Sequence, residues 1–261
     1  MTTIGDIFDK IDELAPFRNA DSFDNSGLLV GSRCDEVTKV LLSLDATLDV
    51  ADEAKEKGCQ LVITHHPVLF NAIKKLDISH PAVRLIRYGI GCICAHTNLD
   101  SAEYNISDIM CELMGLKPND GYFTVNRCDP ETGAAVGYGR VADCEKIAPA
   151  DLAKKAKEAF KCGFVRFVQG KDDITRVAFC SGAGGDFAYE CLRHNAQAFI
   201  TSDIKHHEFL DAYDMGLTVI DCGHFNTEVI VLPYIKEVLS KAFPNVEFMI
   251  SETENSVIKA L

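Results

Sequence analysis

Histidines and carboxylates in this chain gather directly after short apolar runs. In Leu61-Val-Ile-Thr-His-His-Pro67, three β-favouring residues lead into Thr64, His65 and His66. The run predicts a buried strand, and ligands of open α/β sheets bind beyond the carboxyl ends of strands. Two further apolar runs end in a histidine that is followed four residues later by an acid: His96 with Asp100, and His224 with Glu228.

Imidazole and carboxylate groups in this pattern favour a metal site, and Zn, Mn, Fe, Co and Ni accept such ligands. Neighbouring side chains of an extended segment point in opposite directions, and Pro67 biases His66 towards that geometry. We therefore expect His65 and His66 to serve different ions, two divalent ions in all. Asp100 and Glu228 would supply oxygen ligands, with a bridging carboxylate between metals about 3.5–4 Å apart. The alternative is a metal-free scaffold whose histidines are structural.

Apolar strands alternate with helical periodicity along the chain, which predicts an α/β fold with mainly parallel sheets. The expected helices cover residues 3–14, 47–57, 80–88, 103–114, 149–160, 187–194 and 229–241. The expected strands cover residues 28–31, 39–45, 60–64, 91–95, 164–168, 176–180, 198–201, 217–220 and 246–250.

A break and an internal repeat divide the chain into two lobes. Residues 117–140 are rich in Pro, Asn, Asp and Gly, and we place a boundary there. The intervals 40–64 and 177–201 are equally long, and each holds strand, helix and strand before Ile-Thr, which favours duplication. The expected first lobe is 1–120 plus 229–261, with His65, His66 and Asp100. The expected second lobe is 121–228, with His224 and Glu228.

Composition narrows the class of protein. The net charge is −13 and no basic run occurs, which argues against a grip on the nucleic-acid backbone. No apolar run approaches the roughly 20 residues that span a bilayer, so no membrane partner is expected. Eleven cysteines without a CxxC pair favour reduced thiols over disulfides. With no secretion signal at the N-terminus, we expect a cytoplasmic protein.

Two turn segments have simple interpretations. Asp24 and Asn25 are typical turn formers. The glycine-rich turn from Gly182 to Gly185 could bind phosphate at a helix start, but it lacks a full nucleotide-binding motif. Tight packing is an equal explanation for it.

Six segments together resemble the Nif-three-like dinuclear metal family, whose bacterial members are often described as type 2 GTP cyclohydrolase I. They are Asp24-Asn-Ser-Gly-Leu, Thr64-His-His-Pro, His96-Thr-Asn-Leu-Asp100, Ser181-Gly-Ala-Gly-Gly, Thr201-Ser-Asp-Ile-Lys-His-His-Glu and Gly223-His-Phe-Asn-Thr-Glu228. The match covers nearly the whole chain in order. It departs from the family at Ser202, where many members have glycine, and in length, because the chain looks too short for the domain that some relatives insert. The resemblance implies interlocked α/β lobes, a two-metal site in the cleft and a homohexameric ring.

Ligand roles follow from the resemblance. It implies a bridging Glu228, with His65 and Asp100 on one metal and with His66 and His224 on the other. His96 would line the site as a proton carrier. His206, from the second lobe, is a further candidate for proton transfer.

The expected function is a metal-dependent hydrolase acting on a small molecule. In the cyclohydrolase version, the substrate is GTP, whose imidazole ring opens with release of formate. A phosphoester or nucleotide hydrolase would use the same metals. A metal-containing binding or regulatory protein without turnover is the alternative from another class, because metal ligands do not prove catalysis.

Overall fold

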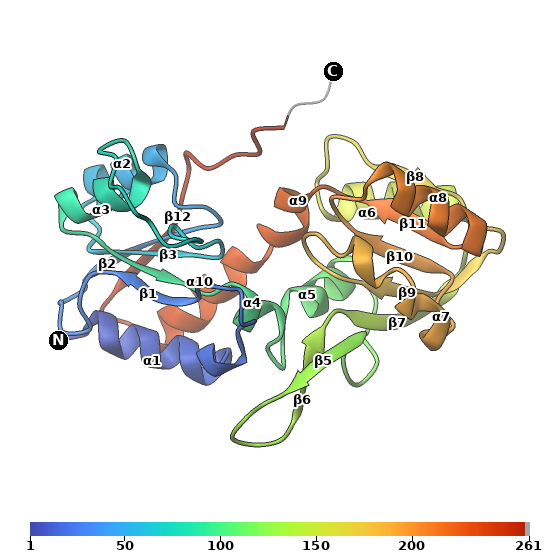
Figure 1. The fold of residues 1–261 in the computed structure, drawn as a ribbon, viewed down its shortest axis with the longest axis horizontal. Coiled ribbons are helices and arrows are strands. Elements are labelled where there is room, and N and C mark those ends of the chain that lie inside the picture. Colours follow the sequence, from blue (N-terminus) through green and yellow to red (C-terminus); the bar gives the residue numbers. More distant parts are fainter. Residues whose placement is uncertain (259–261) are drawn as a thin grey trace. The chain divides into compact units, whose positions relative to one another are not determined.

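The computed structural model describes residues 1–258, which form two compact units (Figure 1). Unit 1 combines Met1–Glu103 with Val231–Asn255, and unit 2 combines Tyr104–Ile230 with the described residues from Ser256. Both units contain sheets and helices, so the predicted α/β class is confirmed. No described helix has the length and apolar character needed to cross a bilayer.

Unit 1 begins with a well-capped helix. Thr3 Oγ1 accepts a hydrogen bond from the Asp6 N–H, and the Asp6 carboxylate accepts one from the Thr3 N–H, which together form a capping box. The helices of unit 1 are α1 (Ile4–Leu14), α2 (Leu48–Lys57), α3 (Pro81–Tyr88), α4 (Thr97–Asp100) and α10 (Val231–Ala242), with a 3₁₀ turn at Phe17–Asn19. Its strands are β1 (Gly27–Val30), β2 (Lys39–Ser43), β3 (Leu61–Thr64), β4 (Gly91–Cys94) and β12 (Glu247–Ile250).

The described strands of unit 1 form a sheet in the order β1-β4-β3-β2-β12. β4, β3, β2 and β12 run parallel, and β1 is antiparallel at the edge. α2 and α3 pack on one face through a cluster that includes Leu41 and Val62, while α1 and α10 lie on the other face (Figure 1). Because both faces are covered, β3 is buried at every position and His65 follows a fixed strand end.

Unit 2 has the same alternation of elements. Its helices are α5 (Ile106–Leu113), α6 (Pro149–Ala159), α7 (Glu190–His194), α8 (His206–Met215) and α9 (His224–Glu228), with a 3₁₀ turn at Gly185–Phe187. Its strands are β5 (Thr124–Cys128), β6 (Ala135–Tyr138), β7 (Arg140–Ile147), β8 (Arg166–Val168), β9 (Ile174–Phe179), β10 (Ala198–Thr201) and β11 (Thr218–Asp221).

The main sheet of unit 2, in its described part, has the order β7-β9-β10-β11-β8, and β5 and β6 pair separately. β9, β10 and β11 are parallel, whereas β7 and β8 are antiparallel edges. One core joins α5 and α6 to the sheet through residues such as Met110 and Ile200. A second core joins α7 and α8 to the opposite face through Phe199 and Val219.

The two units repeat one arrangement of three parallel strands. Gln60 accepts hydrogen bonds from the N–H groups of Thr38 and Lys39, and Gln197 accepts from those of Thr175 and Arg176 at distances of 2.9–3.1 Å. Each glutamine also donates to the carbonyl two residues before it. This shared pattern agrees with the duplication inferred from the sequence.

The histidine–acid pairs are not equivalent within that repeat. Thr64 pairs with Cys94, and Thr201 pairs with Asp221. By this register His96 corresponds to Gly223 rather than to His224. The two His-x3-acid endings therefore differ by one position.

Several elements differ from the sequence predictions. α5 packs on β7 and β9 of unit 2, so the units divide at Glu103–Tyr104 rather than near residue 120. The expected break at 117–140 contains the β5–β6 hairpin. The helices α4, α8 and α9 were not expected, because their polar sequences were interpreted only as strand ends. Residues 259–261 of the expected first lobe lie outside the described part.

Candidate metal centre

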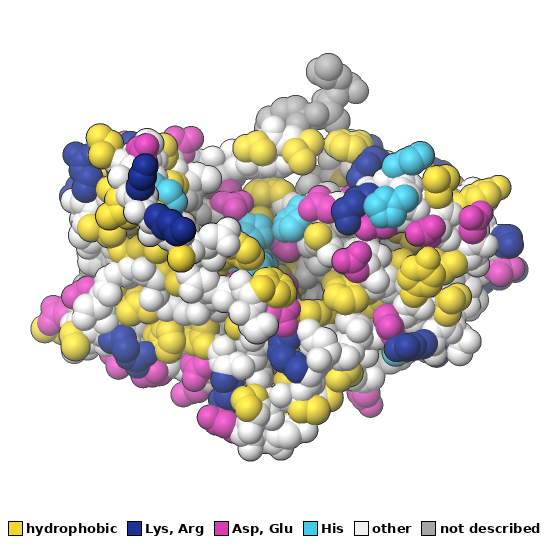
Figure 2. Space-filling view, in the orientation of Figure 1, with side chains coloured by type: hydrophobic (Ala, Val, Ile, Leu, Met, Phe, Trp, Pro, Cys, Tyr) yellow, Lys and Arg dark blue, Asp and Glu magenta, His cyan; other side chains and the backbone are white. Residues whose placement is uncertain are grey.

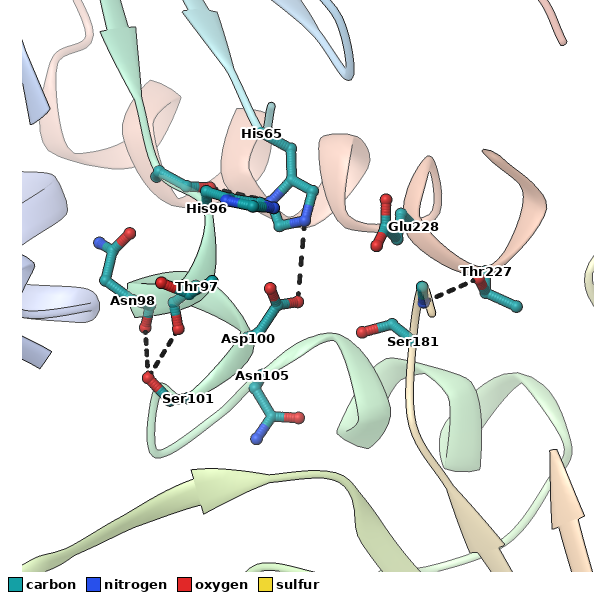
Figure 3. Close-up of polar contacts among 12 residues, drawn as sticks. His65, His96, Thr97, Asn98, Asp100, Ser101, Asn105, Ser181, Thr227 and Glu228 are labelled. Atoms are coloured by element: carbon teal, nitrogen blue, oxygen red, sulfur yellow. Dashed lines mark hydrogen bonds and ion pairs between the residues drawn. The ribbon is translucent and has the colours of Figure 1, made fainter. Parts of the chain in front are cut away.

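His65 and Asp100 lie at the ends of neighbouring elements of unit 1. The chain turns after β3, where Thr64 Oγ1 donates to the His66 carbonyl at 2.8 Å. His65 is buried, and its Nδ1 lies 2.9 Å from the Ala95 carbonyl. Its Nε2 lies 3.7 Å from Asp100 Oδ1, at the end of α4 (Figure 3). Parallel pairing of β3 and β4 thus brings both side chains to one sheet edge.

Carboxylates hold two further histidines of unit 1. His66 Nδ1 lies 2.9 Å from Asp45 Oδ1, and His96 Nδ1 lies 2.8 Å from Asp24 Oδ1. A carboxylate or carbonyl oxygen only accepts hydrogen bonds, so Nδ1 carries the hydrogen in these rings and in His65. Each Nε2 is thereby left as the nitrogen with a lone pair, which is the form that binds metals.

The three rings gather in unit 1. Their centroids lie 5.1 Å apart for His65–His66, 5.1 Å for His65–His96 and 5.5 Å for His66–His96. One nitrogen from each of the three lies within 4.8 Å of the others. The argument that His65 and His66 must point in opposite directions is therefore wrong, because β3 ends at Thr64 and the strand alternation ends with it.

The carboxylate of Asp24 has a role beyond turn formation. Burial disfavours its charged form, but hydrogen bonds from His96, Thr97 and Ser26 outweigh burial and hold the pKa of Asp24 well below its usual range. The carboxylate is therefore ionised at neutral pH and fixes the orientation of the His96 ring. The simple interpretation of Asp24 as a turn former missed this role.

Unit 2 carries a second group of candidate ligands on α9. His224 and Glu228 are one helical turn apart, and His224 Nε2 lies 3.0 Å from Glu228 Oε2. Glu228 is buried, and His224 Nδ1 lies 2.7 Å from Asp203 Oδ2. Asp203 has a φ of 55°, a strained value for a residue other than glycine. The same orienting contact thus recurs in both units.

The glycine-rich turn of unit 2 makes room for Glu228. A Cβ on Gly182 would lie 2.2 Å from Glu228 Oε1, and Gly182 has a φ of +60°. A Cβ on Gly184 would lie 2.4 Å from Thr201 Oγ1. Both clashes support tight packing as the reason for the glycines. Ser202 fits beside them because its hydroxyl donates to the Gly182 carbonyl at 2.5 Å.

A hollow of about 440 Å³ opens beside His224. Its lining includes Lys161, Phe164 and Asn226, together with the carboxylates Asp203 and Asp221. His206, the first residue of α8, lines a different hollow of unit 2 with Phe209 and Tyr213. On the face in view, Lys and Arg occur in separate small groups rather than in a continuous basic area (Figure 2).

The donor set fits a divalent transition metal. Four histidines offer Nε2 while Nδ1 is held by oxygen, and Asp100 and Glu228 add carboxylates. Sequence reasoning missed the holding carboxylates Asp24, Asp45 and Asp203. A signal for two of them was present, since Asp45 ends the predicted strand 39–45 and Asp203 lies two residues after the predicted strand 198–201.

Comparisons with known proteins place the chain in a family. A GTP cyclohydrolase 1 type 2 homolog of Clostridium acetobutylicum is 32% identical over 259 residues, or 95% of each chain. NGG1-interacting factor 3 of Saccharomyces cerevisiae is 31% identical over 244 residues, or 84% of each chain. The crystal structure of a Staphylococcus aureus hypothetical protein superposes with a TM-score of 0.92 at 29% identity, covering 100% of this chain and 99% of that one.

The family model described as Duf34/NIF3 (NGG1p interacting factor 3) matches residues 2–256. Together with the relatives of more than 30% identity, this match covers nearly the whole chain. The chain therefore belongs to the Duf34/NIF3 family.

Proposed function

We propose that this protein is a metal-dependent hydrolase whose centre holds two divalent ions. The supporting observation is the set of histidines whose Nδ1 is held by an oxygen, the arrangement that orients Nε2 for metal binding. Open N/O ligand sets of this kind leave room for water, unlike closed cysteine sites. The names of its relatives favour GTP, or another small nucleotide, as the substrate.

The proposed ligand assignment follows the family resemblance. Under it, Glu228 would be shared by the two ions, His65 and Asp100 would hold one of them, and His66 and His224 would hold the other. We further propose a homohexameric assembly and a cytoplasmic location, as the resemblance and the reduced cysteines favour.

The chain's own residues would prepare the reaction in defined ways. When bound, the two ions would lower the pKa of a water molecule and polarise the bond to be cleaved. Ionised Asp24 keeps the hydrogen of His96 on Nδ1, so His96 Nε2 can accept a proton from water and return it to the leaving group. The hollow beside His224 offers Phe164 for stacking on an aromatic ring and Lys161 for an anionic group.

Metal content and substrate turnover test the proposal separately. Protein purified without chelator should carry up to two first-row ions per chain by elemental analysis. His65→Ala and Glu228→Ala should lower that content with little change in circular dichroism, whereas His80→Ala, outside the site, should not. Full metal content in both ligand variants would contradict the assignment.

Turnover is then measured on the metal-loaded protein. Incubation with GTP should release formate and a pterin precursor, and His96→Ala should reduce the rate while metal remains bound. A loaded protein inactive on GTP and on a panel of nucleotides and phosphoesters would contradict hydrolysis.

A second candidate is a metal-containing binding protein. The yeast relative is named for its interaction with NGG1. Under this alternative, metal would be retained and no substrate would turn over, while an immobilised protein would capture a partner that His65→Ala protein does not capture.

A further inference from the structure

The C-terminal segment of unit 1 reaches the loop that follows β2. Glu254 Oε2 accepts from the Leu44 N–H at 2.7 Å, and Glu254 Oε1 accepts from the Asp45 N–H at 2.6 Å. The Ser43 hydroxyl also donates to Oε1, at 3.1 Å. Glu254 is half-buried, so one carboxylate satisfies two consecutive backbone donors at a sheet edge where water access is limited.

Glu53 fixes the segment that carries Glu254. After β12, the hydroxyls of Ser251 and Thr253 donate to Glu53 Oε2 at 2.6 and 2.7 Å, and the Glu252 N–H donates to Oε1 at 2.9 Å. Glu53 lies on α2 and is buried. The Glu254 N–H in turn donates to Ser251 Oγ at 3.2 Å. These hydrogen bonds therefore fix the backbone of residues 251–254.

The loop held by Glu254 presents Asp45 to His66. Asp45 Oδ1 lies 2.9 Å from His66 Nδ1, and the His66 N–H donates to the Leu44 carbonyl at 2.8 Å. Leu44 and Asp45 thus touch both the ring and the backbone of His66. Without the Glu254 carboxylate, two backbone N–H groups would lose their acceptor and the loop would lose its fixed position.

We propose that Glu254 is a positioning residue for the metal centre, acting through Asp45 on the orientation of His66. The inference rests on the proposed metal function and adds a residue far along the chain from every proposed ligand. Orienting partners of metal-bound histidines typically change metal affinity by about 10–100-fold when removed. Because Glu254 acts on His66 through Asp45 rather than directly, the expected loss of metal affinity is about tenfold.

The test compares Glu254→Gln with Glu252→Gln, a matched control whose side chain is 83% exposed. Glutamine has one oxygen, so it cannot accept from Leu44 and Asp45 as a carboxylate does. Chelator competition should show about tenfold weaker metal binding for Glu254→Gln and unchanged binding for the control. The visible spectrum of Co²⁺-loaded protein should also change only for Glu254→Gln.

A double variant decides whether the effect passes through Asp45. In the Asp45→Asn background, Glu254→Gln should cause little further loss of metal affinity. Full addition of the two losses, or Co²⁺ binding by Glu254→Gln equal to wild type, would overturn the proposal.

A measurement on metal-free protein separates this inference from the metal function. Nitrogen-15 spectra should show His66 with its hydrogen on Nδ1 in the wild type and in Glu252→Gln, and a mixture of tautomers in Glu254→Gln. An unchanged His66 tautomer in Glu254→Gln would refute the positioning role even if no metal binds. If wild-type protein takes up no metal while the tautomer shifts as expected, the metal function fails and the positioning role stands.

Discussion

Replacing Glu53 with Gln should destabilise the protein in a pH-dependent way. Burial alone would raise the pKa of Glu53, but hydrogen bonds from Lys57, Ser251, the Glu252 N–H and Thr253 outweigh burial and lower that pKa from 4.5 to about 2. A carboxyl group with a lowered folded-state pKa stabilises the fold above its unfolded-state pKa. That stabilisation is lost as the pH falls from about 4.5 towards 2.

The size of the effect follows from that difference. The fall from 4.5 to about 2 corresponds to roughly 3 kcal/mol at 1.36 kcal/mol per pH unit. Glutamine retains one acceptor oxygen, so the expected loss for Glu53→Gln at pH 7 is about 1–3 kcal/mol. The loss should shrink as the pH falls below 4.5, because the Glu53 carboxyl of the unfolded wild-type chain begins to take up protons there.

Urea unfolding at pH 7, 5 and 3.5 measures the free energy of unfolding. Glu56→Gln, on the exposed face of the same helix, is the control and should stay within about 0.5 kcal/mol of wild type. A difference between Glu53→Gln and wild type that stays constant across these pH values would refute the electrostatic reasoning. In that case, a loss of shape complementarity or packing at residue 53 would explain the destabilisation.

Three further outcomes are expected. Gly182→Ala should lower both the melting temperature and the metal content, because its Cβ would lie 2.2 Å from Glu228 Oε1, whereas Gly163→Ala has open space and should do neither. Asp24→Asn should lower the free energy of unfolding at pH 7, and urea titrations should show the loss narrowing below pH 4, since the lowered pKa of Asp24 stabilises only the ionised form. Removing metal with chelator should lower the melting temperature of wild type but not of His65→Ala. For wild type that starts with free metal at 100 times Kd, the free energy of unfolding should fall by about 2.7 kcal/mol.

The strands that precede the candidate ligands could be predicted because their apolar runs are short and continuous. β3, β4 and β11 were each expected to within one residue of their observed bounds. Parallel pairing then brings strand ends to one edge whatever the side chains are. The position of His65 directly after β3 therefore followed from the sequence pattern alone.

The carboxylates that hold the histidines could not be assigned from the sequence. Asp24 and His96 are 72 residues apart, and Asp203 and His224 are 21 apart. Such contacts depend on which loops the sheet brings together, and no local pattern records them. Likewise, the gathering of His65 and His66 depends on the residue at which β3 ends.

The path of the chain between the units has a consequence for biosynthesis. The ribosome releases the segment Tyr104–Ile230 before Val231–Asn255, so most of unit 2 can fold while unit 1 still lacks α10 and β12. Until β12 arrives, the edge of β2 is open and Glu254 cannot hold the loop beside His66. A nascent chain would then acquire an ordered His66 only after the segment that carries β12 and Glu254 has emerged.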